Sequence, residues 1–195
     1  MNEQAKPLDT SRELASLRRQ IDRLQTRAAI EELCSAYGRA CDERDLKRLV
    51  HLFTPEGTFK SKDGARSTSG RRAINDMYKG RFRVLGPTYH WTHNLIVTFD
   101  DKNEDVAYGQ ILGHAECFKN GKAMLSGSRY DDIFHRNDGV WLFYERAISH
   151  LYYMPVEEYA EGLGSRLRMR VDGEPGPADF PEKLPTWTTW EDYNV

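Results

Sequence analysis

The chain has 195 residues, 39% of them hydrophobic and 11% aromatic, which is enough for one domain with a substantial core and too little for two ordinary domains. Its 28 basic and 30 acidic residues give a net charge of −2, and this balance argues against a nucleic-acid partner, which selects a basic surface. The three cysteines indicate neither a disulfide framework nor a zinc cluster.

The sequence contains no pattern typical of membrane targeting. The first residues, MNEQAKPLDTSREL, lack the apolar region of a signal peptide. No apolar run approaches the roughly 18 residues that cross a bilayer. We therefore expect a soluble, cytoplasmic protein that does not contact a membrane.

Helical periodicity dominates the first part of the chain. A capping-box pattern at Thr10 predicts a helix start, and an apolar stripe continues as far as Asp42. A short second helix is expected over 46–53, and a third over 71–78, ended by Gly80. The stripe begins with four residues at 3-4-3 spacing: Leu14, Leu17, Ile21 and Leu24. We predict that residues 1–26 form a helical extension on the surface or between subunits, because two heptads are too few for an independent coiled coil.

After this helical part the pattern changes to runs of β-branched and aromatic residues. They cover residues 88–99, 105–118, 122–135 and 140–153. Asn120-Gly121 and Asp138-Gly139 have the composition of two-residue hairpin turns. Four strands joined in this way predict an antiparallel meander. Helices first and strands second predict an α+β domain, in which the helices cover one face of a curved sheet.

The pattern ends at Glu161, after which glycine, proline and charged residues predict no core element. We therefore take residues 156–195 as a C-terminal tail. Its Trp187, Trp190 and Tyr193 are too apolar for a fully solvated end, and we expect them to dock on the domain or on a neighbouring subunit.

Acid and base side chains are the candidates for chemistry, because phosphate-binding, Rossmann, nucleophile-elbow and zincin motifs are absent from the sequence. His90 and His93 have a spacing that could suggest metal ligands. In a strand, however, residues three apart point to opposite faces, so we predict no metal site. The six histidines are His51, His90, His93, His114, His135 and His150. Taken one at a time, each is more often a hydrogen-bonded structural residue than a catalyst.

Asp42 closes the apolar helical stripe beside Tyr37 and Cys41. As a structural residue it would cap this helix or the next one. As a functional residue it needs an imidazole partner, because a buried carboxylate fixes one histidine tautomer and stabilises the imidazolium. Such a dyad can remove a proton from a carbon next to a carbonyl or a leaving group.

Several segments together resemble the SnoaL-like branch of the NTF2-like superfamily. They are Arg27–Asp42, Leu52–Gly57, His90-x-x-x-Asn94, Tyr130-x-Asp132-x-Phe134 and Asp138–Trp141. Within that branch they are most similar to the group of bile-acid 7α-dehydratase, scytalone dehydratase and hexachlorocyclohexane dehydrochlorinase. The resemblance implies a cone-shaped α+β barrel over residues 27–155, with an apolar pocket, an Asp-His dyad and no cofactor.

Carried over residue by residue, the resemblance places the catalytic aspartate on Asp42 and the histidine on His90. The tyrosine five residues before the aspartate falls on Tyr37. A second pocket histidine would fall on His114. On the last strand the resemblance departs, because the bile-acid enzyme has an arginine where this chain has His150, so a carboxylated or CoA-linked substrate is not implied.

These observations lead us to expect a dehydratase-type lyase that acts on a hydrophobic cyclic substrate such as a steroid, a polyketide or an aromatic precursor. His90 would take the proton and Asp42 would orient it. Tyr37, with His114 or His150, would bind the developing enolate or the departing hydroxyl.

Two other functions fit the same residues. An isomerase would use the same dyad. A non-catalytic subunit that binds a ligand or supports a ring-hydroxylating oxygenase would use the same cone. Whether the protein is an enzyme or a binding subunit, we expect a homo-oligomer, because the stripe and the tail offer apolar surface. Relatives form trimers or dimers, and we expect a trimer.

Overall fold

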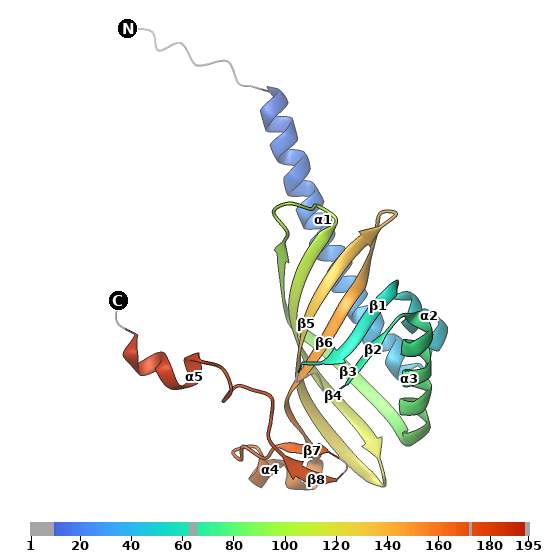
Figure 1. Ribbon diagram of the computed structural model, residues 1–195, viewed down its shortest axis with the longest axis vertical. Coiled ribbons are helices and arrows are strands. Elements are labelled where there is room, and N and C mark those ends of the chain that lie inside the picture. Colours follow the sequence, from blue (N-terminus) through green and yellow to red (C-terminus); the bar gives the residue numbers. More distant parts are fainter. Residues whose placement is uncertain (1–9, 63–65, 172, 194–195) are drawn as a thin grey trace.

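The computed structural model describes residues 10–62, 66–171 and 173–193, so residues 1–9 of the predicted extension lie outside the described part. Three helices precede or interrupt the early strands: α1 (Thr10–Asp42), α2 (Leu46–His51) and α3 (Arg71–Val84). The strands are β1 (Phe53–Ser61), β2 (Ser67–Ser69), β3 (Leu85–Phe99), β4 (Val106–Lys119), β5 (Lys122–Asn137), β6 (Val140–Pro155), β7 (Met169–Val171) and β8 (Glu174–Gly176). Together they form the α+β fold that the order of patterns predicts (Figure 1).

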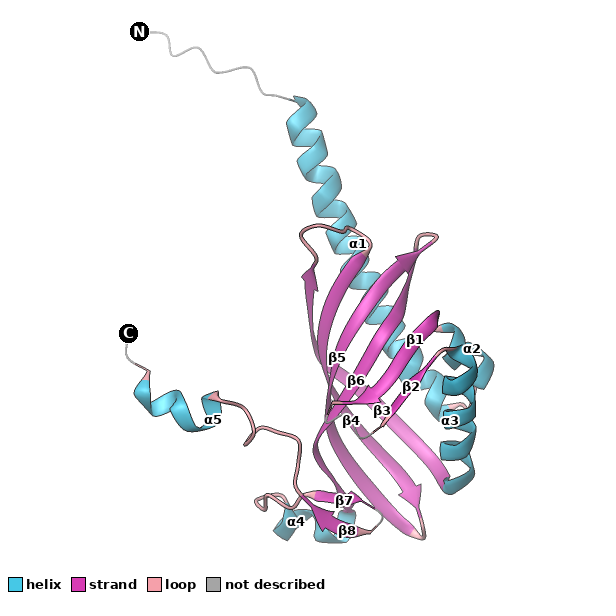
Figure 2. Cartoon of the chain, in the orientation of Figure 1, coloured by secondary structure: helices cyan, strands magenta, loops and turns pink. Residues whose placement is uncertain are grey.

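The long strands form the predicted antiparallel meander. The main path of the sheet runs β2-β1-β6-β5-β4-β3, and each neighbouring pair from β3 to β6 is antiparallel. Both predicted hairpin turns have positive φ at their two central residues, 53° and 78° at Asn120-Gly121 and 50° and 79° at Asp138-Gly139. The sequence does not predict that β1 pairs parallel to β6. The sheet is curved but does not close into a barrel (Figure 2).

The helices cover one face of this sheet, as expected (Figure 2). Buried residues recur at helical spacing along the second half of α1 and pack with the aromatic residues of β5 and β6: Ile30, Leu33, Cys34, Tyr37, Ala40 and Cys41 on the helix, and Tyr130, Phe134 and Phe143 on the strands. We call this side of the sheet the inner face. Within the described ranges, no helix combines the length and the apolar composition that a membrane span needs.

Helix α3 is longer than predicted, because it continues through Gly80 as far as Val84. The extra turn is held by the Phe82 ring, which lies 5.7 Å from the Tyr78 ring and 4.4 Å from the guanidinium carbon of Arg44. Packing on both sides therefore outweighs the low helix propensity of glycine, which is about 1 kcal/mol.

The tail is more structured than the sequence indicates. Short helical turns η1 (Val156–Glu158) and α4 (Tyr159–Gly162) lead into β7, which extends the sheet by pairing with β6. Ala178 and Phe180 are buried. The segment ends in α5 (Thr186–Thr189) and η2 (Trp190–Asp192), which stand away from the body (Figure 1). The three aromatic side chains there remain exposed, Trp187 by 47%, Trp190 by 67% and Tyr193 by 78%, so docking on the protein's own domain is not observed.

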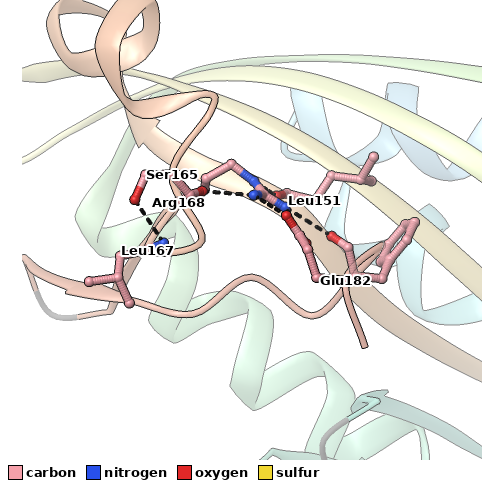
Figure 3. A network of polar contacts seen from close by, with 6 residues as sticks. Leu151, Ser165, Leu167, Arg168 and Glu182 are labelled. Atoms are coloured by element: carbon pink, nitrogen blue, oxygen red, sulfur yellow. Dashed lines mark hydrogen bonds and ion pairs between the residues drawn. The ribbon is translucent and has the colours of Figure 1, made fainter. Parts of the chain in front are cut away.

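Arg168 joins the tail to the sheet edge (Figure 3). Its tail partners are Ser165, Phe180 and Glu182. Its Nε donates to the carbonyl of Leu151 on β6 at 3.0 Å. Its two terminal nitrogens donate to the Glu182 carboxylate at 2.6 and 2.8 Å. These hydrogen bonds from Arg168 lower the pKa of Glu182 from 4.5 to about 2. The contribution of this pair to stability is therefore present above pH 4.5 and is lost as the pH falls towards 2.

Replacing Glu182 with Gln should loosen the tail at neutral pH, since the amide cannot match the charge of Arg168. We expect faster hydrogen exchange at the amides of Ala178 and Asp179, which donate to the carbonyls of Arg166 and His150. Glu161→Gln, an exposed change in the same tail, is the matched control. Equal protection of these amides in both variants would argue against the anchor.

Candidate active site

Asp42 and His90 form a hydrogen-bonded pair at the junction of α1 and β3. The His90 Nδ1 lies 2.5 Å from Asp42 Oδ1, and the His90 backbone amide donates to Oδ2 at 2.8 Å. The Thr88 hydroxyl also donates to Oδ1 at 2.8 Å. Three groups on one strand therefore fix a carboxylate that ends a helix.

The charge state of Asp42 determines the tautomer of His90. Burial raises the pKa of Asp42, but the hydrogen bonds from His90 and Thr88 and the nearby imidazole outweigh it, so that the pKa lies below 3.8. An ionised carboxylate can only accept hydrogen bonds. The proton is therefore assigned to Nδ1, and in the neutral ring Nε2 carries the lone pair that can act as a base.

A glycine allows α1 to lie directly on His90. A Cβ atom at Gly38 would lie 3.2 Å from the His90 Cβ, which is closer than side chains ordinarily pack. Gly38 is one turn before Asp42 on the same helix, so its missing side chain helps to set the distance between helix and histidine.

Gly38→Ala should therefore reduce turnover several-fold without unfolding the protein, because a shift of a few tenths of an ångström at His90 disturbs the aligned pair. Gly80→Ala is the matched control, since it is also a helical glycine and its Cβ would meet nothing within 4 Å. We expect the control to keep full activity and to gain up to about 1 kcal/mol of stability. The same turnover in both variants would contradict this role of Gly38.

Tyr37 lies on the buried side of α1, one turn before Cys41, and its hydroxyl is 2.5 Å from the hydroxyl of Tyr78. Burial, reinforced by Tyr78, raises the pKa of Tyr37 well above 10. The phenol therefore keeps its proton and can serve as a hydrogen-bond donor, but not as a base near neutral pH.

His114 lies on the face of the sheet opposite to His90, so the structure does not bring these two histidines together. His90 is the β-sheet partner of Ala115, so these two side chains share a face, and the next residue along β4, His114, points to the other face. There it stacks on Trp91, with ring centroids 5.7 Å apart. Counting in twos along one strand groups residues correctly but does not show which group faces the helices.

His150 lies on the same face as His90 but three strands away. Its sheet partner Ser128 pairs in turn with Gly113, two residues from Ala115, so the chain of pairings stays on the inner face. Three strand spacings correspond to about 14 Å along the sheet. The His150 Nδ1 lies 3.4 Å from the Ser126 hydroxyl, so this side chain lines the far wall of the inner face.

Arg146 is a buried residue of the inner face that the alternation of residues in the sequence does not predict. Its guanidinium is fully buried, and its carbon lies 4.1 Å from the Tyr37 ring centroid and 3.9 Å from that of Tyr130. One nitrogen lies 3.7 Å from a carboxylate oxygen of Asp132, which is also buried. In the described structure none of the three guanidinium nitrogens makes a hydrogen bond.

A bulge in β6 explains why this arginine is not predicted. Trp141 and Phe143 face inward, and period two would then place Arg146 outward. The register shifts where Phe134 pairs with Phe143 and Ile133 with Glu145, which adds a residue and turns Arg146 to the inner face. A possible signal was Asp132, an acid in the inward alternation of Tyr130 and Phe134, since a buried acid needs a partner.

The dyad remains open to small molecules. The side chains of Asp42 and His90 are 25% and 24% exposed, so a bound molecule can reach the imidazole. Tyr37 and Arg146 are buried among the aromatic residues of the inner face. Within the described part of the chain, no group of three or more His, Cys, Asp or Glu side chains is placed to hold a metal ion.

The chain is similar to known proteins over most of its length. The family model of the SnoaL-like domain matches residues 22–147. A γ-hexachlorocyclohexane dehydrochlorinase from Sphingobium indicum is 26% identical over 148 residues, which are 70% of this chain and 87% of that protein. The relationship supports lyase-type chemistry.

Solved structures show the same fold. A type 2 hexachlorocyclohexane dehydrochlorinase has a TM-score of 0.65 at 24% identity, covering 70% of this chain and 93% of the other. A proposed scytalone dehydratase from Novosphingobium aromaticivorans has a TM-score of 0.64 at 20% identity, covering 70% and 91%. With a family match over most of its length and NTF2-like neighbours in structure, the chain belongs to the SnoaL-like domain family.

Proposed function

We propose that this protein is a cofactor-independent lyase that removes water from a hydrophobic cyclic substrate through the Asp42–His90 dyad. The observation that carries the proposal is the hydrogen bond between Asp42 and Nδ1 of His90, because it leaves Nε2 as the base. The relationship to dehydrochlorinases, which are named for an elimination reaction, is consistent with it.

The reaction begins when Nε2 of His90 takes a proton from a carbon next to the one that bears the hydroxyl. The electrons of the broken C–H bond form the new double bond as the C–O bond breaks. The leaving hydroxide takes a proton, which the imidazolium can return, and departs as water. Asp42 stabilises the imidazolium that exists between these transfers and holds the ring in one orientation.

In this scheme Arg146 and Tyr37, both buried on the inner face, supply hydrogen-bond donors to the substrate. The guanidinium nitrogens have no hydrogen-bond partner among the described residues, so a carbonyl or a departing oxygen of the substrate would satisfy groups that are otherwise buried and unpaired. Donors held in this way by packing stabilise developing negative charge without reorganising. The surrounding rings of Tyr37, Tyr130 and Phe143 favour a substrate with a large apolar face.

A panel of substrates tests the proposal. It contains hydroxylated steroids, hydroxylated polycyclic aromatic precursors and γ-hexachlorocyclohexane, with loss of water followed by mass spectrometry and chloride release by ion chromatography. We expect elimination from at least one ring-hydroxylated compound. Turnover of the chlorinated compound alone would replace the dehydratase by a dehydrohalogenase. Double-bond migration without loss of a group would identify an isomerase, and tight binding without turnover would identify a binding subunit.

A further inference from the structure

The apolar stripe predicted for α1 divides between two sides of the helix, and its first four residues, which we call the stripe below, lie away from the buried face. The side chains of Leu14, Leu17, Ile21 and Leu24 are 50 to 67% exposed, and no other described residue covers them. In Figure 1 the first half of α1 runs past the end of the sheet and stands free of the body. The family match begins only at residue 22, so most of this stripe lies outside the family domain.

The stripe and the core contact lie on opposite sides of the helix. An α-helix turns about 100° per residue, so the stripe centres about 180° from the direction of Thr26, Ile30 and Leu33. Those three residues are buried against the body. A second helix can therefore lie along the stripe without displacing any element of the fold.

The spacing of the stripe is that of a coiled-coil seam. Leu14 and Ile21 take the a positions, and Leu17 and Leu24 take the d positions. Of the two a positions, only Ile21 is the β-branched residue that, with leucine at d, favours two parallel strands. A second copy of this chain presents an identical seam in the same register.

Charges beside the seam also fit a parallel pair. In that arrangement a g residue of one helix meets the e residue of the next heptad on the other helix. Glu13 then faces Arg18, and Arg27 faces Glu32, so both charged pairs are attractive. Arg27 also lies over the ring of Phe99, 5.1 Å from its centroid, which leaves Glu13 and Arg18 as the cleaner pair to test.

We propose that two copies of this protein associate through α1, as a short parallel coiled coil along Leu14, Leu17, Ile21 and Leu24. Two heptads are too few for an independent coiled coil, but α1 is already held as a helix by the burial of its second half, so two preformed helices pair in a concentration-dependent way. It is independent of the proposed reaction, because Asp42, which holds His90, lies at the other end of the helix.

Disulfide trapping in the full chain tests the contact. In a parallel pair the two copies of residue 17 face each other, so Leu17→Cys should form a disulfide-linked dimer under mild oxidation. Arg19→Cys, exposed on the outer side of the helix, is the control and should give only background. Equal cross-linking of the two variants would overturn the proposal. So would Leu17→Cys that links to Ile21→Cys but not to itself, which indicates an antiparallel pair.

A charge exchange tests the direction independently. In the Leu17→Cys background, Glu13→Arg or Arg18→Glu alone makes both copies of this pair repulsive, and the cross-linking yield should fall about three- to tenfold. Mixing the two single variants restores opposite charges across the seam and should restore the yield. A yield that is unchanged in both single variants, or that stays low in the mixture, would contradict the parallel arrangement.

Discussion

Replacing His90 with Ala is expected to lower the turnover of the elimination reaction by about 10²- to 10⁴-fold, the range found for removal of a general base. The imidazole is the base of the dyad, because the Asp42 carboxylate holds the ring proton at Nδ1 and leaves the lone pair of Nε2 for the substrate. The measurement is kcat on whichever substrate of the panel the unmodified protein turns over.

The fold should survive this change, since the His90 side chain is 24% exposed and its backbone amide still donates to Asp42. Urea unfolding should therefore give a free energy of unfolding close to that of the unmodified protein. His114→Ala is the matched control, because it removes an imidazole from the opposite face of the same sheet. Full turnover in the His90 variant, or an equal loss in both variants, would contradict the dyad.

Local chemistry made much of the fold predictable. Asn-Gly and Asp-Gly dipeptides have few alternatives to a tight turn, so the meander followed from them. The buried stripe of α1 followed from helical spacing. The parallel pairing of β1 with β6 depends on contacts distant in sequence, and the pairing of the tail depends on the edge that β1 leaves free after Ser61. Neither has a local signal.

The resemblance gives the positions of Asp42 and His90 in the sequence. It gives no sign of Arg146, which lies where the register of a strand changes. Asp42 and His90 come together as the resemblance implies. His114 lies on the opposite face from His90, which the sequence does not show because alternation alone does not identify the inner face. Arg146 was missed because a bulge shifts the alternation of β6, and bulges leave no clear mark in a single sequence.

The buried pair of Asp132 and Arg146 should give the largest stability effect. Arg146 stays charged at all relevant pH values, so above pH 7, where Asp132 is ionised, Asp132→Leu leaves a buried cation without a counter-charge and should reduce the free energy of unfolding by about 3–5 kcal/mol. The double variant Asp132→Leu/Arg146→Met replaces both charges by apolar groups among the aromatic rings and should be close to the unmodified protein. Urea unfolding of the single and double variants measures both effects. Equal losses in the single and double variants would show that the two charges are not coupled.

Arg146→Met alone should behave differently, because a carboxyl group can become neutral and a guanidinium cannot. Burial already raises the pKa of Asp132 to about 7 although Arg146 lowers it, so removing the arginine raises that pKa further. The folded state then binds a proton that the unfolded state releases near pH 4, and stability falls as the pH rises. In the unmodified protein this fall should end near pH 7, whereas in Arg146→Met it should continue above pH 7. Parallel stability curves above pH 7 would contradict the coupling.

The kcat of the double variant Asp132→Leu/Arg146→Met tests whether Arg146 also takes part in the reaction. If this variant is stable but its kcat is about 10²- to 10³-fold lower, the loss comes from the missing hydrogen-bond donor and not from unfolding.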